Sequence, residues 1–281
     1  MENQRNGSQG GLQSSGGLTV TDGMSDTASS AEIAQRQEDE YAFPYHYIPA
    51  YDDSAFSQTR HYSWGFRYLG GLKVVADTLN ALPHESVLDV GCGEGRFLRD
   101  YSQTRPHLRL KGIDTSERSI AYARAFSPML DFEVRDIVSE PPEERFDVAT
   151  LIEVLEHIPP DQTDDFLAAI AKSLAPEGRL VLTVPHKNVP LIPKHFQHFD
   201  SVSLPQTLAN SFEVEKLVFF DAPKAFPLWL MKTLLGGGGS RFVITLPALN
   251  RAFMRIYTRR YLYVNAEARC GRLLAIARPR A

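Results

Sequence analysis

The sequence predicts an α/β fold, a doubly wound sheet of mostly parallel strands with helices on both faces, and three stretches of chain carry this prediction. Residues 86–95 (SVLDVGCGEG) place an apolar run before closely spaced glycines, which is typical of a buried strand that ends in a tight turn. No helix breaker follows, so residues 96–98 begin a helix. Two further strands, 108–114 and 131–136, each end at an acidic residue. Strand, glycine-rich loop and helix together predict a ligand site at the carboxyl edge of the sheet.

The spacing of the acidic residues supports this ligand site. Asp114 lies about twenty residues after the loop, the position from which an acidic side chain accepts hydrogen bonds from a ribose. Asp136 ends the next strand. An ordinary β–α turn would explain the glycines but not acids at the next two strand ends. The pattern therefore indicates an adenosine-binding edge.

Five segments resemble the class I S-adenosylmethionine-dependent methyltransferases, among them the ubiquinone-biosynthesis O-methyltransferases and the type 11 and type 12 methyltransferase domains. The segments are VLDVGCGEG, GID, VRDI, FDVATLIEVLEHI and LAPEGRLVLTVP, in this order, within residues 84–220. The resemblance implies a seven-stranded Rossmann-like sheet with strand order 3-2-1-4-5-7-6. It also implies S-adenosyl-L-methionine as the cofactor.

The same resemblance implies roles for individual residues. Asp89 would orient the loop and the methionine amino group of the cofactor, and Asp114 would hold the ribose hydroxyls. Asp136 and Ile137 would read the adenine, and Glu153 would line the cofactor edge. The expected cofactor-binding residues are Asp89, Gly91, Cys92, Gly93, Gly95, Asp114, Thr115, Asp136, Ile137 and Glu153.

Composition narrows the class of protein. The chain has 281 residues, 43% of them apolar, which is enough for a full core. A formal net charge of −4 gives no general attraction to nucleic acid, and no DNA partner is expected. The two cysteines, Cys92 and Cys270, argue against a disulfide framework and for a reducing cytoplasm. No signal peptide and no apolar run of about eighteen residues is visible.

The chain divides into five predicted parts. Residues 1–40 are polar and predict a disordered tail. Residues 41–83 predict an aromatic lid and a helix, and 84–221 the cofactor-binding core. Residues 222–270 are too long for an unstructured loop and predict an inserted cap between strands six and seven, and 271–281 predict the final strand.

Periodicity and end signals predict the remaining elements. Helices are expected at 71–82, at 115–126 with Thr115 or Ser116 as N-cap, at 163–178 and at 203–211. Strands are expected at 146–152, 179–185, 212–220 and 272–279.

Methyl transfer is an in-line displacement at an activated sulfonium, so the protein mainly has to align the acceptor. An oxygen acceptor also needs a general base. Glu153, Glu156 and His157 are spaced i, i+3 and i+4 and would share one face of a helix. His157 is the expected base, and His195 and His198 are the other expected catalytic residues.

The segment EVLEHI has three interpretations. It either shapes the cofactor pocket alone, or provides His157 as a base, or joins His195 or His198 in binding a divalent metal such as Mg²⁺, Mn²⁺ or Zn²⁺. The third resembles the small-RNA 3′-terminal ribose 2′-O-methyltransferases. The first two are favoured because EVLEHI also occurs in similar metal-free enzymes, including the quinone O-methyltransferases, so no metal is expected.

The expected function is methyl transfer to a small-molecule, glycan or lipid-linked acceptor, most often at oxygen. Arg60, Trp64 and His186 are the expected substrate residues, although His186 is equally well explained as a turn residue. The alternatives are the metal-dependent RNA methyltransferase and a domain that binds the cofactor without turnover.

The C-terminal segment is rich in arginine, with one acid, Glu267, from residue 241 onward. It is either a solvated helical face or a site for an anionic group, such as phosphate, a lipid headgroup or RNA. Interleaved aromatic residues also suit a peripheral membrane contact. The arginines are 241, 251, 255, 259, 260, 269, 272, 278 and 280.

Overall fold

A computed structural model describes residues 30–40, 50–52, 55–57, 62–223, 230 and 247–280. The first 29 residues of the predicted tail, Arg60 of the predicted lid and most of the first half of the predicted cap lie outside the described residues.

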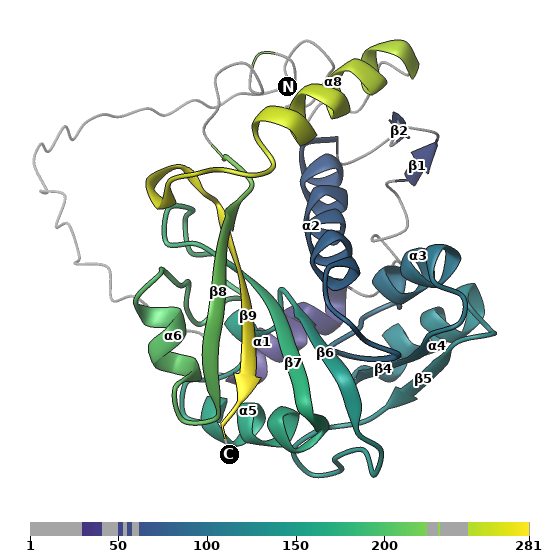
Figure 1. Cartoon of the computed structure of the whole chain (residues 1–281), viewed down its shortest axis with the longest axis vertical. Helices are drawn as coiled ribbons and strands as arrows, with labels where there is room; N and C mark the ends of the chain where they lie inside the picture. The colour runs from purple at the N-terminus through teal and green to yellow at the C-terminus, as the bar shows by residue number, and fades with distance from the viewer. Residues whose placement is uncertain are drawn as a thin grey trace, which may run out of the picture.

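Seven strands form one sheet in the order β5-β4-β3-β6-β7-β9-β8 (Figure 1), which confirms the predicted order 3-2-1-4-5-7-6. The strands from β3 to β7 pair in parallel, whereas β9 is antiparallel to both of its neighbours, β7 and β8. Their bounds are β3 Ser86–Val90, β4 Arg109–Asp114, β5 Asp131–Val134, β6 Phe146–Ile152, β7 Leu174–Pro185, β8 Phe212–Phe220 and β9 Arg272–Pro279.

Helices cover both faces of the sheet, because successive side chains of its strands point to opposite faces. Val87 of β3 belongs to one apolar core and Leu88 to the other. The first core includes side chains from α2 Tyr62–Asn80, α3 Arg96–Thr104, α4 Glu117–Phe126 and α8 Pro247–Arg260. The second includes side chains from α5 Thr163–Lys172 and α6 Ser203–Leu208.

Helix α2 begins nine residues before the predicted helix and includes three glycines that lower helix propensity. Tertiary packing explains the extension. A Cβ at Gly70 would lie 2.8 Å from Cε1 of Tyr257 in α8, so glycine lets the two helices approach closely. The ring of Phe66 meets the rings of Phe253 and Tyr257 edge-on, at centroid distances of 4.8 and 4.9 Å. Figure 1 shows α8 crossing the end of α2.

The predicted disorder of residues 1–40 is wrong for its last part, because Ser30–Glu40 form helix α1. Ile33 is buried, and Nη1 of Arg36 donates a hydrogen bond of 3.1 Å to the carbonyl oxygen of Pro193. The burial of Ile33 and this contact with a residue far along the chain explain why a polar segment forms an ordered helix. Within the predicted lid, Ala50–Asp52 (β1) and Ala55–Ser57 (β2) pair as antiparallel strands.

Several predicted boundaries also move. The helix predicted at 163–178 ends at Lys172, and its last residues lie in β7, which begins at Leu174. Strand β5 ends at Val134, before Asp136. Ser116, and not Thr115, caps α4, because its side chain accepts a hydrogen bond from Ser119 N. In the described part of the chain, no helix has both the length and the apolar character to cross a bilayer.

Candidate active site

The loop after β3 is a backbone turn with its glycines in the left-handed region. Gly91, Gly93 and Gly95 have φ angles of 70°, 53° and 73°. The N–H of Gly91 donates to the carbonyl oxygen of Ile113 at 2.9 Å, which ties the loop to β4. A Cβ at Gly91 would lie 2.6 Å from Cγ2 of Val154, so the loop is also packed against the segment after β6.

Asp114 ends β4 and touches this loop. Its Oδ2 accepts from Gly93 N at 2.9 Å, and its Oδ1 accepts from Ser116 N at 2.9 Å. Burial raises the pKa of Asp114, against the lowering effect of these hydrogen bonds. A carboxylate has about four lone-pair positions, so both oxygens can still accept from a diol. The loop and the acid of the next strand thus lie together at the carboxyl edge of the sheet.

Asp89 lies inside β3 and bonds across the sheet. Thr150 Oγ1 donates to Asp89 Oδ1 at 2.6 Å, and the Asp89 side chain is buried. Burial raises the pKa of Asp89 to about 7, only partly offset by the Thr150 hydrogen bond. The amides of Gly91 and Cys92 bond to the carbonyl oxygen of Ile113, and that of Gly93 bonds to Asp114, rather than to Asp89. Asp89 therefore supports the loop through β3 and β6 instead of orienting it directly.

Two other expected cofactor-binding residues are Cys92, in the loop, and Thr115, directly after β4. Burial raises the pKa of the Cys92 thiol well above its usual range, and the charges of Asp114 and Asp89 add to this effect. The thiol is therefore neutral and suits a small-residue slot rather than a nucleophile. Thr115 is exposed between β4 and α4.

The third acidic position differs from the expectation. Asp136 stands two residues beyond β5 and caps its own turn, accepting from Val138 N at 2.9 Å and from Ser139 Oγ at 3.1 Å. The side chain of Ile137 is buried in the core. Any contact of these two residues with an adenine would thus use their backbone or the remaining lone pairs of Asp136.

Glu153 follows β6 in a conformation that side chains rarely adopt, with φ 56°. Its Oε2 lies 3.3 Å from Nε of Arg272. Its Oε1 is buried and has no hydrogen-bond partner among the described residues. Glu153 therefore has one oxygen fixed by β9 and one available to a ligand.

Arg272 also belongs to a buried charged network that the sequence analysis missed. Asp221, in the turn after β8, accepts from Nε and Nη2 of Arg67 at 2.8 and 2.6 Å and from the Tyr257 hydroxyl at 3.1 Å. Nε of Arg272 is 3.7 Å from Oδ2 of Asp221. The network joins α2, α8 and β9 to Glu153. Its only sequence signal is an acid directly after an apolar strand.

Glu153, Glu156 and His157 do not share one face of an α-helix, because the segment EVLEHI is not α-helical. Leu155–His157 form one turn of 3₁₀ helix, η2, and Glu153 precedes it in the left-handed region. Glu156 is fully buried, and neither of its carboxylate oxygens has a hydrogen-bond partner among the described residues. Burial raises the pKa of Glu156 well above its usual range, and the nearby charge of Glu153 adds to this.

Three histidines gather beside Glu156. The rings of His157 and His195 meet edge-on with centroids 4.7 Å apart, and the His195 and His198 centroids are 5.1 Å apart. Burial lowers the pKa of His195 to about 2, and the neighbouring His157 adds to this effect. Burial also lowers the pKa of His198. His195 and His198 are therefore neutral near pH 7.

Carbonyl partners fix which ring nitrogens carry hydrogen. His157 Nδ1 is 2.9 Å from the carbonyl oxygen of Lys194, which can only accept, so His157 Nε2 has the lone pair. His198 Nδ1 faces the carbonyl oxygen of Val189 at 3.1 Å, so His198 Nε2 accepts from Nδ1 of His195 at 2.8 Å. His195 Nε2 therefore also has a lone pair.

The expected substrate residues are not all placed together. His186 is buried, its Nδ1 accepts from Asn188 N at 2.9 Å, and its Nε2 lies 3.0 Å from Oε1 of Glu267. Both ring nitrogens are used, so the structure favours the turn interpretation of His186. Trp64 lies in α2, but its side chain and the whole of Arg60 are outside the described residues.

The arginines of the C-terminal segment also separate into groups. Arg272 is in the buried network, Arg278 pairs with Glu213 at 2.6 Å, and Arg280 Nε donates to the carbonyl oxygen of Phe212 at 3.3 Å. Four arginines of α8 are exposed, on the side away from its buried Phe253, Met254 and Tyr257. They are Arg251, Arg255, Arg259 and Arg260.

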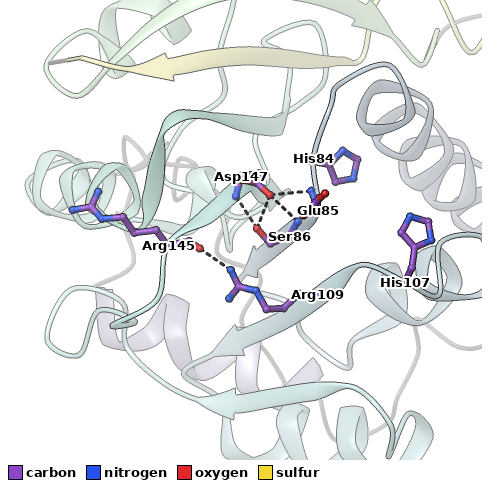
Figure 2. A pocket seen from close by; sticks show the side chains of 7 residues that line it. All are labelled: His84, Glu85, Ser86, His107, Arg109, Arg145 and Asp147. Atoms are coloured by element: carbon purple, nitrogen blue, oxygen red, sulfur yellow. Dashed lines mark hydrogen bonds between the residues drawn. The ribbon is translucent and has the colours of Figure 1, made fainter.

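A separate hollow of about 670 Å³ lies at the opposite, amino-terminal edge of the sheet. Figure 2 shows its polar groups bonded to one another: Asp147 accepts from Glu85 N and from both the amide and the hydroxyl of Ser86, and Arg109 donates to the Arg145 carbonyl oxygen. These bonds hold the starts of neighbouring strands together. The hollow is therefore explained by structure and lies away from the glycine loop.

Comparison with known proteins identifies the family. A family model described as "Methyltransferase domain" matches residues 66–255, more than half of the chain. The ubiquinone biosynthesis O-methyltransferase of Bradyrhizobium sp. (strain ORS 278) is 32% identical over 117 residues, 40% of this chain and 45% of the relative. The demethylspheroidene O-methyltransferase of Rhodobacter capsulatus is 36% identical over 97 residues, 34% of this chain and 24% of the relative. These matches span less than half of each relative.

Solved structures share the fold at lower identity. The 1,6-didemethyltoxoflavin-N1-methyltransferase of Burkholderia thailandensis, bound to 1,6-didemethyltoxoflavin and S-adenosylhomocysteine, matches with a TM-score of 0.53 and 18% identity, over 93% of this chain and 94% of that chain. The N-methyltransferase NodS of Bradyrhizobium japonicum WM9, bound to S-adenosylhomocysteine, matches with a TM-score of 0.50 and 18% identity, over 77% and 88%.

Proposed function

Because this chain belongs to the methyltransferase domain family, we propose that it transfers a methyl group from S-adenosylmethionine to an oxygen atom of a small-molecule acceptor. The observation that carries the proposal is the 2.9 Å hydrogen bond between Gly93 N and Asp114. It brings the glycine loop and the acidic end of the next strand to one position at the carboxyl edge of the sheet.

The residues at this edge fit the cofactor. Asp114 would hold the ribose hydroxyls, and the loop from Gly91 to Gly95 would leave room for the ligand against the backbone. Asp136 and Ile137 remain proposals for the adenine end and Glu153 for the methionine end. When bound, S-adenosylmethionine supplies an activated methyl group on sulfur. The chain's own task is then to hold the acceptor oxygen in line and to remove its proton.

His157 is the proposed base for this proton. Its Nδ1 is bound to Lys194, so its Nε2 has a lone pair that can accept. The ring of His195 contacts that of His157, the ring of His198 lies beside that of His195, and both His195 and His198 are neutral. Oxygen is proposed as the acceptor atom because the two sequence relatives named above are O-methyltransferases, whereas the two structural neighbours, which share the fold alone, are N-methyltransferases.

A second candidate is an acceptor with phosphate groups, including the ribose at the 3′ end of an RNA. The exposed arginines of α8 favour it, because Arg251, Arg255 and Arg259 recur every fourth residue along one face. The same face could meet an anionic membrane surface. Methyl transfer to a short RNA, and flotation with anionic liposomes, test these two options; no transfer and no flotation would exclude them.

Calorimetry on the purified chain tests the main proposal. S-adenosylmethionine and S-adenosylhomocysteine should both bind, and Asp114→Ala should weaken binding at least about tenfold, since each lost hydrogen bond to a charged group is worth about 1.5–3 kcal/mol. Asp165→Ala, an exposed acid on α5, is the matched control and should bind normally. Unchanged affinity in Asp114→Ala would refute the cofactor site. Transfer of labelled methyl to phenolic and other hydroxyl compounds then separates an enzyme from a domain that only binds.

A further inference from the structure

Helix α8 carries positive charges that neither the active site nor the network at Asp221 uses. In the part of the chain that the structure describes, these guanidinium groups are exposed and have no hydrogen-bond or ion-pair partner. They belong to Arg251, Arg255, Arg259 and Arg260. The helix contains no acidic residue that would balance them. Unpaired cations gathered on one helix indicate an anionic partner from outside the chain.

The arginines of α8 point away from its buried side. Phe253 and Tyr257 pack into the first apolar core, with α2. At about 100° per residue, the arginines at 251, 255 and 259 lie within about 80° of one another on the opposite side, and they span about 12 Å of the helix. We call these three arginines the α8 stripe. Figure 1 shows α8 at the top of the molecule, beyond the end of α2.

The neighbours of the α8 stripe favour a phospholipid surface over a nucleic acid. Ala252, between two of the arginines, is small and exposed, so the stripe itself offers no ring on which a base would stack. Apolar side chains border one flank instead: Leu249 is 39% exposed, and Ile256, seven residues later, is half-buried. Arginines bordered by apolar side chains are typical of helices that lie in the headgroup region of a bilayer.

We propose that the α8 stripe docks the chain on the surface of an anionic phospholipid bilayer. Guanidinium groups bind phosphate oxygens through paired hydrogen bonds. Each arginine near such a surface strengthens binding about fivefold, so the stripe would give a weak and reversible contact. The chain as a whole has a net charge of −4 and is not attracted to an anionic surface at long range. The contact therefore depends on this helix and weakens as salt is added.

Helix α8 lies near the edge of the sheet that carries the candidate active site. Strand β8 runs in the same direction as β7, since both are antiparallel to β9. Directly after β8, the N–H groups of Asp221 and Ala222 donate to the carbonyl oxygens of Leu262 and Tyr261 at 2.7 and 2.9 Å, which fixes the end of α8 at the carboxyl edge. Docking would hold this edge near the bilayer. An acceptor dissolved in the bilayer would then be close to the site, a consequence that rests on the proposed methyl transfer.

Flotation and arginine footprinting test the docking on the wild-type chain. Phosphatidylcholine vesicles with about 30% phosphatidylglycerol should float the chain at about 50 mM salt but not at about 500 mM, and pure phosphatidylcholine vesicles should not float it. The anionic vesicles should protect Arg251, Arg255 and Arg259 from phenylglyoxal, as read by mass spectrometry, but not Arg145, exposed at the opposite edge. No flotation, equal protection of Arg145, or binding of a short RNA without vesicle binding would overturn the proposal.

Variants then locate the contact. Arg255→Gln should lower vesicle binding about fivefold, and the triple variant that adds Arg251→Gln and Arg259→Gln about a hundredfold. Lys172→Gln is the matched control, because this exposed lysine ends α5 on the opposite face of the sheet, and it should bind as the wild type does. Thermal unfolding should be unchanged in each variant, since the substituted side chains are exposed. Equal binding by the wild type and the triple variant would overturn the proposal.

The affinity for S-adenosylhomocysteine in solution is measured in parallel. A chain that binds this compound but not the vesicles would overturn the docking alone. A chain that binds the vesicles through α8 but not this compound would support the docking and overturn the proposed methyl transfer.

Discussion

The two halves of the site differ in how their polar groups are satisfied. In the half formed by the ends of β3 and β4, Asp89 and Asp114 are bonded to Thr150, Gly93 and Ser116. In the half formed after β6 and β7, Glu153 and Glu156 keep buried oxygens with no partner among the described residues. The fold thus bonds both strand acids of the first half, whereas the two acids of the second half keep oxygens that a ligand could bond.

This difference separates generic from specific function. A preformed loop and acid can bind the same cofactor in many enzymes, because they depend on backbone and one side chain. Unsatisfied carboxylates and oriented histidines are costly to keep and are retained where a particular ligand uses them. Specificity should therefore be sought after β6 and β7.

Gly95→Ala should affect the most properties, because damage to the preformed half changes both stability and cofactor binding. The new Cβ would lie 2.4 Å from Cζ of the buried Phe132, at a φ of 73°. We expect the free energy of unfolding to fall by about 2–4 kcal/mol and cofactor binding to be lost. Denaturant titration and calorimetry measure both. Adding Phe132→Leu should restore part of the stability; no recovery would show that this contact is not the cause.

His157→Ala tests whether the halves act separately. We expect kcat to fall by about 10²–10⁴, the usual range for a lost acid–base group, with the Kd for the cofactor changed less than about twofold. Kinetics with any accepted hydroxyl compound and calorimetry give the two numbers. His107→Ala is the control. A parallel fall in cofactor affinity would mean that the two halves are one unit.

Asp221→Ala tests the network that supports Glu153. Removing this buried acid leaves Arg67 and Arg272 without their shared partner, which should lower the free energy of unfolding by about 3–5 kcal/mol. Glu213→Ala removes an exposed partner of Arg278 and should change it by less than about 1 kcal/mol. If the two variants lowered the free energy of unfolding equally in denaturant titrations, burial of the network would have no energetic consequence.

The effect of Asp89→Asn should be visible as a change in how stability depends on pH. The pKa of Asp89 is raised to about 7 in the folded chain, so the folded state holds this proton more tightly than the unfolded state. Its contribution to stability is therefore largest at low pH and is lost as the pH rises through about 7. Between pH 5 and pH 8 the free energy of unfolding of the wild type should fall by about 3 kcal/mol more than that of Asp89→Asn. If the stabilities of the two proteins changed equally with pH, the result would contradict the raised pKa of Asp89.

Most of the sheet was predictable from the sequence, because its signals are local. Apolar runs such as those in β3 and β6 are bounded by glycine or acidic residues. The order of the strands in the sheet follows from the resemblance of the motifs and their spacing to those of the methyltransferases. The N-cap at Ser116 is likewise a short-range hydrogen bond. Asp114 could be placed beside the glycine loop because its position depends on the strand end alone.

The misses share a long-range cause. Helix α2 extends through Gly70 because Tyr257, far along the chain, packs on that glycine. EVLEHI is a 3₁₀ turn rather than a helix, since Glu153 is held by Arg272 in the left-handed region. His186, whose two predicted roles the sequence left open, lies 3.0 Å from Glu267 Oε1, which is far along the chain. None of these contacts leaves a periodic pattern in the sequence.

The network at Asp221 also has a consequence for synthesis on the ribosome. Arg272 begins β9, the last of the seven strands along the sequence, yet it is the counter-ion of Glu153 and Asp221. Domains generally fold as units, N-terminal part first. The nascent chain can therefore assemble β3 to β6 early, while the network around Glu153 stays incomplete until β9 has been made.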